Sequence, residues 1–534
     1  MTMFPRAPMS DAIASAPPSQ FNLAAHLCEL NAGRATKVAY IDDRDALPYG
    51  ELASRIARFA TVLRESGLRR EERVLLLAHD TVDWPVAFLG AIHAGVVPVA
   101  VNTLLPATDY AYMLTHSRAR AAIVSAALLP TLMQALQQGA ADVETVWVIA
   151  APAQLASDQR DFRAAVDSAE PSTAAEPTHA DDAAFWLYSS GSTGMPKGTV
   201  HTHANAYWTE ALYGRNVLQL NEDDVVFSAA KLFFAYGLGN ALTFPLSAGA
   251  TTILMPERPT PQAVFRRLVK HRPSVFYGVP TLYAAMLAAP DRPARDAVSL
   301  RRCVSAGEAL PREIGEQFTA HFGCEILDGI GSTEMLHIFL SNRAGDVRYG
   351  TTGVPVPGYD VELRGDDGRI VGDGEVGDLY IRGPSAALMY WTSHAKSRST
   401  FQGEWTRSGD KYSRRDDGYY VYAGRADDML KVSGLYVSPF EVEGALVQHP
   451  AVLEAAVIGR QDYDGLTKTK AFVVLKPGHV ADAALEAALK TFVKDKLAPY
   501  KYPRSIEFIA ELPKTATGKI QRFKLREREA PRAP

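Results

Sequence analysis

Short apolar runs alternate with longer amphipathic stretches over most of the chain. Between residues 73 and 150, four β-branched runs are separated by helical patterns: RVLLLA, VVPVAV, AAIVSA and TVWVIA. Six more follow between residues 183 and 330: AAFWLYS, DVVFSA, TTILMP, SVFYGV, RRCVSA and EILDGI. Strands that alternate with helices predict βαβ units on parallel sheets. We therefore expect an α/β fold in which two similar parallel-type layers, one from each group of runs, lie side by side.

Three other regions have different patterns. Residues 151–182 are rich in Ala, Pro, Ser and Asp without a period, which predicts a surface connection between the two layers. After Gly353, short apolar runs with Asp-Gly turns predict a compact antiparallel β unit. The C-terminal part mixes apolar strands with an amphipathic helix around Leu489. We expect a flexible N-terminus (1–20), a large N-terminal domain (21–425) and a small mobile α+β domain (426–534).

The composition of the 534-residue chain is that of a globular protein. It is 47% hydrophobic and 22% charged, and its net charge of −4 offers no general attraction to nucleic acid or anionic membranes. The longest apolar run, 87–105, is interrupted by polar residues, glycine and proline, and predicts a buried helix and strand rather than a membrane span. Three isolated cysteines and the absence of a signal-peptide pattern favour a reducing, cytoplasmic location.

The stretch YSSGSTGMPKG, residues 188–198, combines three glycines, several hydroxyls and one lysine after an apolar strand. Glycine N–H groups can surround a phosphate while hydroxyls and a lysine bind its oxygens. It is not a Walker loop, because Lys197 follows Pro196 and precedes Gly198, so the required hydroxyl after the lysine is missing. A polar hairpin turn is the alternative, and this stretch alone does not decide between them.

Five further stretches share this density of glycine, hydroxyl and acidic residues. They are SAGEALP (305–311), DGIGSTE (328–334), RSGD (407–410), GRADDMLKVSG (424–434) and PKTATGKIQR (513–522). With the 188–198 stretch, and in this order, they resemble the acyl-adenylate-forming superfamily of acyl-CoA synthetases, peptide-synthetase adenylation domains and luciferases. The resemblance covers about residues 20–525. The pocket stretch FFAYGLGN (233–240) and the run FNLAAHLCELNAGRATKVAYIDD (21–43) look like those of benzoate-CoA ligases.

The resemblance implies a two-step reaction. A carboxylate is joined to AMP with loss of pyrophosphate, and coenzyme A then displaces AMP. Because an anion must approach the phosphorus of another anion, the enzyme's main task is to neutralise charge and align the reactants. The substrates would be an aryl acid, ATP and coenzyme A, with Mg²⁺ as cofactor. The small domain would rotate about a hinge at Asp427 between the two steps.

The resemblance also implies roles for individual residues. Lys519 would reach the carboxylate and the α-phosphate, Thr333 would contact the α-phosphate, and Glu334 would ligate Mg²⁺. The other nucleotide contacts would be Ser189, Ser192, Thr193 and Lys197 for the phosphates, Gly307, Glu308, Ala309, Asp328, Gly329 and Ile330 for adenine, and Asp410 with Arg425 for ribose. After rotation, Lys431 and Gly434 would line the path of coenzyme A.

The acid would be bound by FFAYGLGN (233–240), YGVP (277–280) and GIGSTEMLHI (329–338). From these stretches we expect contacts from Ala235, Tyr236, Gly278, Gly331, His337 and Ile338. FFAYGLGN holds no acid to pair with an ammonium group, which argues against an amino-acid substrate. Aromatic and aliphatic side chains with glycines between them favour a flat aryl acid. His337 either bonds the substrate or packs as a neutral ring, and we favour packing.

Several alternatives stay open from sequence alone. The acid could be a substituted benzoate or another short acid. A luciferase-like adenylating oxygenase could use the same fold, and a sensor could bind an acyl nucleotide without turnover. Retention of Glu334, Asp410 and Lys519 together argues against the sensor. Neither a nucleic acid nor a membrane is expected as a partner, and a homodimer is compatible with the sequence.

Overall fold

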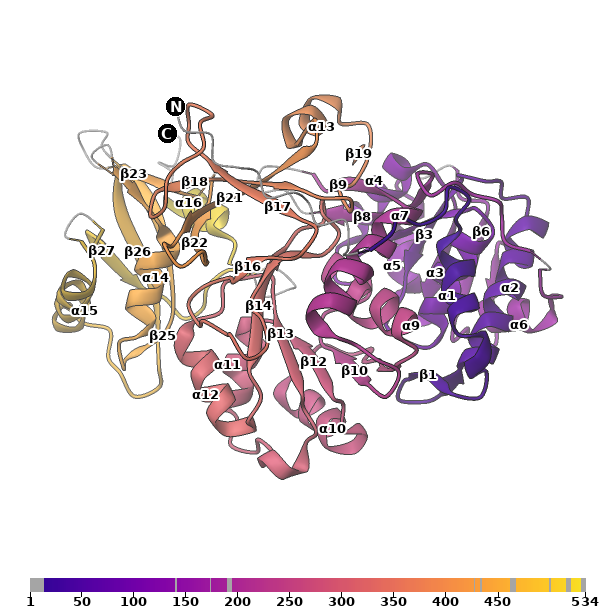
Figure 1. Ribbon diagram of the computed structural model, residues 1–534, viewed down its shortest axis with the longest axis horizontal. Helices are drawn as coiled ribbons and strands as arrows, with labels where there is room; N and C mark the ends of the chain where they lie inside the picture. The colour runs from indigo at the N-terminus through magenta and orange to yellow at the C-terminus, as the bar shows by residue number, and fades with distance from the viewer. Residues whose placement is uncertain are drawn as a thin grey trace. The chain divides into compact units, whose positions relative to one another are not determined.

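The protein is described from a computed structural model, shown in Figure 1. The structure describes residues 14–139, 142–172, 174–189, 195–426, 428–432, 435–461, 467–498, 501–514 and 520–529. The chain forms two compact units. The first comprises Met1–Val361 and Ile381–Arg407, and the second comprises Glu362–Tyr380 and Ser408–Pro534.

One sheet of the first unit has eight strands. Their order is β19 (Met389–Tyr390), β9 (Lys197–Thr202), β8 (Ala183–Ser189), β4 (Val97–Ala100), β3 (Arg73–Leu77), β5 (Ala119–Ser125), β6 (Thr145–Ile149), β7 (Gln159–Asp161). Strands β8 to β7 run parallel along this order, and β9 and β19 add an antiparallel edge.

Helices cover both faces of this sheet. The apolar side chains of β3 divide between the two faces. Val74 and Leu76 join the core that contains α2 (Tyr49–Glu65), α3 (Asp83–His93) and α6 (Phe162–Ser168). Leu75 and Leu77 join the core that contains α4 (Ala107–Ser117) and α5 (Leu129–Leu136). Burial on both faces explains why these strands are continuous apolar runs rather than alternating ones.

The second sheet of this unit has nine strands. Their order is β16 (Val354–Pro355), β15 (Ile338–Ser341), β14 (Ile326–Gly331), β13 (Arg302–Ser305), β12 (Val275–Gly278), β10 (Val225–Ser228), β11 (Thr251–Ile253), β1 (Val38–Ile41), β2 (Ala46–Pro48). The strands from β14 to β1 are parallel. One face packs against α10 (Pro261–His271), α11 (Pro280–Ala288) and α12 (Arg312–Phe322).

Two expectations about this unit are wrong. AAFWLYS was expected in the second layer, but as β8 it pairs with β4 in the first, Val99 opposite Trp186. Periodicity identifies a strand and says nothing about its partner, and β1 and β2 from the N-terminal region extend the second sheet instead. Residues 151–182 hold β7 and α6, whose Phe162 is buried. These elements are too short to give a periodic signal.

The remaining elements of this unit are short. They are α1 (Leu23–Leu30), η1 (Ala32–Arg34), η2 (Ala126–Leu128), α7 (His203–Thr209), η3 (Glu210–Leu218), α8 (Ala235–Leu238), η4 (Gly239–Thr243), α9 (Phe244–Ala248), η5 (Arg295–Ala297), α13 (His394–Thr400) and β20 (Phe401–Gln402). Two of them, η3 and η4, are π-helical, a geometry that is often found at functional sites. None of the helices in the described ranges is both long and apolar enough to cross a membrane.

The second unit is a small α+β structure, as expected. Strands β17 (Asp360–Arg364), β18 (Val376–Arg382) and β21 (Trp405–Arg414) run across the unit boundary. The other elements are β22 (Tyr420–Arg425), β23 (Leu430–Val432), β24 (Leu435–Val437), α14 (Pro439–Val447), β25 (Val452–Gln461), β26 (Thr467–Leu475), α15 (Ala483–Lys496), β27 (Ser505–Phe508) and α16 (Arg522–Glu529). Leu489 of α15 is fully buried in its core.

The α/β class, with two parallel-type sheets in a large unit and a smaller α+β unit, is confirmed. The domain boundary at 425/426 and the hinge stay predictions, because Asp427 lies outside the described residues.

Candidate active site

The carboxyl ends of β12, β13 and β14 lie side by side in register. Gly278 is opposite Ser305, and Ser305 is opposite Asp328. Because the strands are parallel, the stretches YGVP, SAGEALP and DGIGSTE leave the sheet at the same edge. This is the edge at which open α/β sheets bind ligands. The structure thus brings together three stretches that are about 50 residues or fewer apart along the chain and that were predicted to act together.

The SAGEALP loop leaves open space above its glycine. Gly307 has a φ of +95°, and an added Cβ would meet only Val279 Cγ1, at 4.0 Å. Glu308, Ala309 and Ile330, which were expected to line the adenine site, are half-buried. The loop is tied back to the sheet by the Leu310 N–H, which donates to Asp328 Oδ2 at 3.4 Å. Burial raises the pKa of Asp328 well above its usual range, which favours its neutral form.

Tyr236 joins the expected acid-binding stretch to the sheet. It lies on α8, and its hydroxyl is 3.1 Å from the carbonyl oxygen of Val304 and 3.3 Å from that of Gly278. The preceding residue, Ala235, is buried. The Tyr236 hydroxyl therefore fixes α8 against β12 and β13 near the carboxyl ends of these strands.

His337 is a buried, neutral ring in the same region. Its Nε2 lies 3.3 Å from the carbonyl oxygen of Tyr236 and 3.1 Å from Oδ1 of Asn240. Because a carbonyl oxygen only accepts, Nε2 carries the proton. Burial lowers the pKa of His337 to about 3, so the ring is uncharged at neutral pH. It packs edge-on against Phe244, with ring centroids 4.5 Å apart.

Glycines make room for this histidine. An added Cβ at Gly331 would lie 2.5 Å from the carbonyl oxygen of His337, and one at Gly239 would lie 2.4 Å from its Cδ2 atom. Ile338, which is buried in β15, lies against Gly329, where a Cβ would come within 3.0 Å of the Ile338 side chain. These glycines are therefore required by close packing.

One residue expected to bind phosphate and the residue expected to ligate Mg²⁺ both contact Tyr390. Lys197 begins β9 in register with Ser189 at the end of β8, and its Nζ lies 4.9 Å from the ring centroid of Tyr390. The Tyr390 hydroxyl donates to Glu334 Oε1 at 2.6 Å. Thr333 precedes Glu334 and is also half-buried. Lys197 from the eight-stranded sheet and Glu334, which follows β14 of the nine-stranded sheet, are thus linked through one side chain.

Glu334 fits a nucleotide-bound magnesium ion better than a protein-only metal site. In the part of the chain that the structure describes, no group of three or more His, Cys, Asp or Glu side chains could hold a metal. Mg²⁺ commonly uses one or two carboxylates together with substrate phosphates and water. A single carboxylate beside the expected phosphate residues is compatible with that arrangement.

The second unit contains the expected ribose pair. Asp410 on β21 is opposite Arg425 on β22, and Arg425 Nη1 lies 3.2 Å from Asp410 Oδ1. Asp410 is largely buried, and its N–H donates to the Ser408 hydroxyl. Lys431 lies on β23 opposite Tyr436. The other expected site residues, Ser192, Thr193, Gly434 and Lys519, lie outside the described residues.

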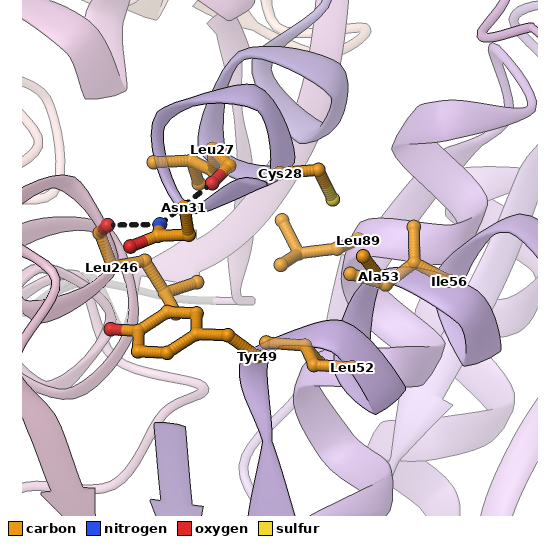
Figure 2. Close-up of a pocket in the computed structure, with 9 residues that line it drawn as sticks. All are labelled: Leu27, Cys28, Asn31, Tyr49, Leu52, Ala53, Ile56, Leu89 and Leu246. Atoms are coloured by element: carbon orange, nitrogen blue, oxygen red, sulfur yellow. Dashed lines mark hydrogen bonds between the residues drawn. The ribbon is translucent and has the colours of Figure 1, made fainter. Parts of the chain in front are cut away.

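A small cavity elsewhere lacks suitable chemistry. It measures about 10 Å³ and lies among α1, α2, α3 and α9 (Figure 2). The amide of Asn31 at its edge is bonded to the carbonyl oxygens of Leu27 and Leu246. Burial raises the pKa of the Cys28 thiol to about 12, so this thiol is neutral and unreactive. The cavity is a packing defect of the core rather than a reactive site.

Two residues of this region were not expected from the sequence. Asn240 ends the FFAYGLGN stretch but was given no role, although its position inside a predicted binding stretch was a usable signal. Tyr390 lies in a two-residue strand outside every stretch that was singled out. No local pattern marks it, because its importance comes from contacts with residues 56 and 193 positions away.

Family models and known relatives match almost the whole chain. The model for AMP-binding enzymes matches residues 29–391, and that for the AMP-binding enzyme C-terminal domain matches residues 441–519. The chain belongs to the AMP-binding enzyme family. This AMP-binding enzyme is 58% identical to the benzoate–CoA ligase of Thauera aromatica, over 95% of the chain and 96% of the relative.

Two solved structures are also similar to this AMP-binding enzyme. A benzoate CoA ligase from Burkholderia xenovorans has 63% identity and a TM-score of 0.88, covering 95% of this chain and all of that one. An anthranilate CoA ligase in complex with anthranoyl-AMP has 42% identity and a TM-score of 0.91, covering 96% and 98%. The resemblance stated from the sequence motifs, to adenylate-forming enzymes and benzoate-CoA ligases in particular, is confirmed.

Proposed function

We propose that this protein is an ATP-dependent ligase that joins a benzoate-like aromatic acid to coenzyme A. The acid is first converted to an acyl-AMP, and pyrophosphate is released. The thiol of coenzyme A then attacks the acyl carbon, and AMP leaves. The full-length similarity to benzoate–CoA ligases supports this proposal at both steps, because both the large and the small unit are covered.

One observation carries the proposal. Between Gly331 and Ile338 the chain changes from polar to apolar within a few residues. Glu334 lies in the group with Tyr390 and Lys197, while His337 packs against Phe244 beside Tyr236. The residues expected to hold phosphate and Mg²⁺ thus adjoin an uncharged aromatic wall, which is formed by Tyr236, Phe244 and His337. A flat acid held at that wall would present its carboxylate to the α-phosphate.

Each of the expected site residues would have its own role in the reaction. In the first step a carboxylate oxygen forms a bond to the α-phosphorus and the bond to pyrophosphate breaks. Lys197 and Thr333 would hold phosphate oxygens, and Lys519 would offset charge at the reacting centre. Magnesium, held by Glu334 and the nucleotide, would neutralise phosphate charge. Asp410 would accept hydrogen bonds from the ribose hydroxyls, as a carboxylate does for a vicinal diol.

The aromatic wall favours an uncharged ring. His337 is neutral and its Nε2 proton is already bonded within the protein, so benzoate meets no unpaired charge there. The buried Nδ1 of His337 has no hydrogen-bond partner among the described residues. Hydroxybenzoates and 2-aminobenzoate are the alternatives, because similar proteins include a 4-hydroxybenzoate/benzoate–CoA ligase and an anthranilate CoA ligase. Coenzyme A would enter along Lys431 and Gly434, as the family resemblance implies.

The test measures each product separately. Pyrophosphate, AMP and thioester are followed with benzoate, hydroxybenzoates, 2-aminobenzoate and aliphatic acids, with and without coenzyme A. We expect benzoate-dependent pyrophosphate release and equal amounts of AMP and benzoyl-CoA. Formation of ADP, or an oxygen-dependent product in place of a thioester, would exclude the proposal. A cytoplasmic location and a homodimer are further predictions, checked by fractionation and by light scattering.

A further inference from the structure

Tyr390 lies between the two groups that are expected to face the phosphates. It is 3% exposed, its hydroxyl lies 2.6 Å from Glu334 Oε1, and its ring centroid lies 4.9 Å from the Nζ atom of Lys197. One side chain therefore contacts a carboxylate and an ammonium group at once. These two charges belong to segments that lie 137 residues apart along the chain.

The backbone fixes the position of Tyr390 independently of these contacts. Tyr390 pairs with Thr199 on β9. Its N–H donates to the Ser397 hydroxyl at 3.0 Å, and that hydroxyl lies 3.2 Å from the Tyr390 carbonyl oxygen. Its ring packs against Phe401, with centroids 5.4 Å apart. The phenol is thus held in place before any nucleotide binds.

The same segment also holds the backbone around Glu334. The Ala387 N–H donates to the Glu334 carbonyl oxygen at 2.8 Å, and the Ser385 hydroxyl donates to that of Met335 at 2.8 Å. Both the main chain and the carboxylate of Glu334 are therefore oriented by residues 385–390. A carboxylate that is fixed in this way loses little freedom when a cation binds to it.

The chemistry of each contact is specific. A hydroxyl that donates to a carboxylate makes a short, charge-assisted hydrogen bond and leaves the other acceptor positions of the carboxylate for a metal ion. Partners that orient a metal-ligating carboxylate typically change metal affinity 10- to 100-fold when they are removed. The aromatic face attracts the Lys197 ammonium and restricts where it can lie.

We propose that Tyr390 is a positioning residue that orients the Glu334 carboxylate toward the magnesium ion of MgATP and holds the Lys197 ammonium beside the same phosphates. This role rests on the proposed function of the site. Tyr390 would touch neither the reacting atoms nor the acid. Its contribution would therefore be confined to binding of the metal-bound nucleotide.

Two substitutions separate this role from a general effect on folding. Tyr390→Phe removes the hydrogen bond to Glu334 and keeps the ring next to Lys197. Tyr359→Phe is the matched control. It also removes a buried hydroxyl, which bonds to Ser385 at 2.7 Å on the same segment but does not contact Glu334. The Tm of Tyr390→Phe and that of Tyr359→Phe should be nearly equal.

Calorimetry of nucleotide binding is the first readout, because it needs no turnover. For Tyr390→Phe we expect the Kd of MgATP to rise at least about tenfold, while the Kd of metal-free AMP changes less than about twofold. The Mg²⁺ concentration that gives half-maximal pyrophosphate release should rise, with the KM of the acid unchanged. Tyr359→Phe should leave all these values near those of the wild type.

Two results would overturn the role of Tyr390. One is a MgATP affinity of Tyr390→Phe equal to that of the wild type. The other is an equal loss for MgATP, AMP and the acid, which would indicate a purely structural residue. The proposed function fails separately, if the wild type binds MgATP but forms no acyl-AMP with any acid. Failure of the wild type to bind MgATP would overturn both.

Discussion

Asn240 accepts a hydrogen bond from His337, whose Nε2 lies 3.1 Å from the amide oxygen. The two residues come from the π-helical segment η4 and from the turn between β14 and β15. The bond fixes the tautomer of the ring, and burial keeps the ring neutral by lowering its pKa to about 3. The aromatic cluster of Tyr236, Phe244 and His337, which is expected to face the acid, is therefore uncharged at neutral pH.

Buried neutral histidines should make the protein less stable in acid. Burial lowers the pKa of His93 and His203 to about 4 and that of His337 to about 3. The unfolded chain has a histidine pKa of about 6.5 and so binds these protons first as the pH falls. Each histidine should therefore cost about 2 kcal/mol of stability between pH 7 and pH 5, measured by urea unfolding.

The slope of the unfolding free energy against pH isolates the contribution of His337 to stability. Asp80 has the opposite effect on stability as the pH falls. Burial raises its pKa to about 6, so the folded state binds this proton before the unfolded chain does. We therefore compare the pH dependence of His337→Asn with that of wild type and of His479→Asn, an exposed control. The His337→Asn slope should be shallower. Identical slopes for all three proteins would contradict a buried neutral His337.

Gly239→Ala should weaken binding of the acid more than binding of ATP. The new Cβ would lie 2.4 Å from His337 Cδ2, so the ring must move and the aromatic wall changes shape. We expect the KM of the acid to rise at least about tenfold, because small displacements in a substrate site are costly. The control is Gly444→Ala in α14, where an added Cβ meets nothing within 4 Å. An unchanged KM of the acid would show that His337 does not shape its site.

Asp410→Asn should reduce the affinity for ATP and AMP alike. The carboxylate is expected to accept two ribose hydrogen bonds, and hydrogen bonds to a charged group contribute about 1.5–3 kcal/mol, which corresponds to about 10- to 100-fold in Kd. Calorimetry with AMP measures this without turnover. Asp373→Asn, which breaks an exposed ion pair with Arg414 in the same unit, is the control. Equal affinities for the two variants would remove Asp410 from the nucleotide site.

Lys519→Ala should slow adenylation far more than thioester formation from preformed benzoyl-AMP. The lysine is expected to act at the α-phosphate only in the first step, before the small domain rotates. Gly434→Leu should have the opposite effect, because a side chain there would obstruct the thiol. Single-turnover assays of each half-reaction measure both. Equal losses in the two steps would argue against rotation of Lys519 out of the site.

The sequence by itself determined the fold class and the positions of the stretches that carry the family resemblance. Strands such as RVLLLA are buried on both faces, so their apolar character is local and visible along the chain. The glycine-rich stretches are also visible along the chain, because each is defined by residues that are neighbours in the sequence. The family resemblance that these stretches carry is what gave Glu334, Asp410 and His337 their expected roles, and those roles stay predictions.

Only the tertiary structure decided how these parts meet. It placed β8 in the first sheet, because strand pairing depends on surfaces rather than on order along the chain. It showed that His337 is neutral, since its pKa reflects burial by Phe244 and other distant residues. It also revealed Tyr390, whose proposed role depends on contacts to Lys197 and Glu334. Such contacts join residues far apart in sequence, and no local pattern records them.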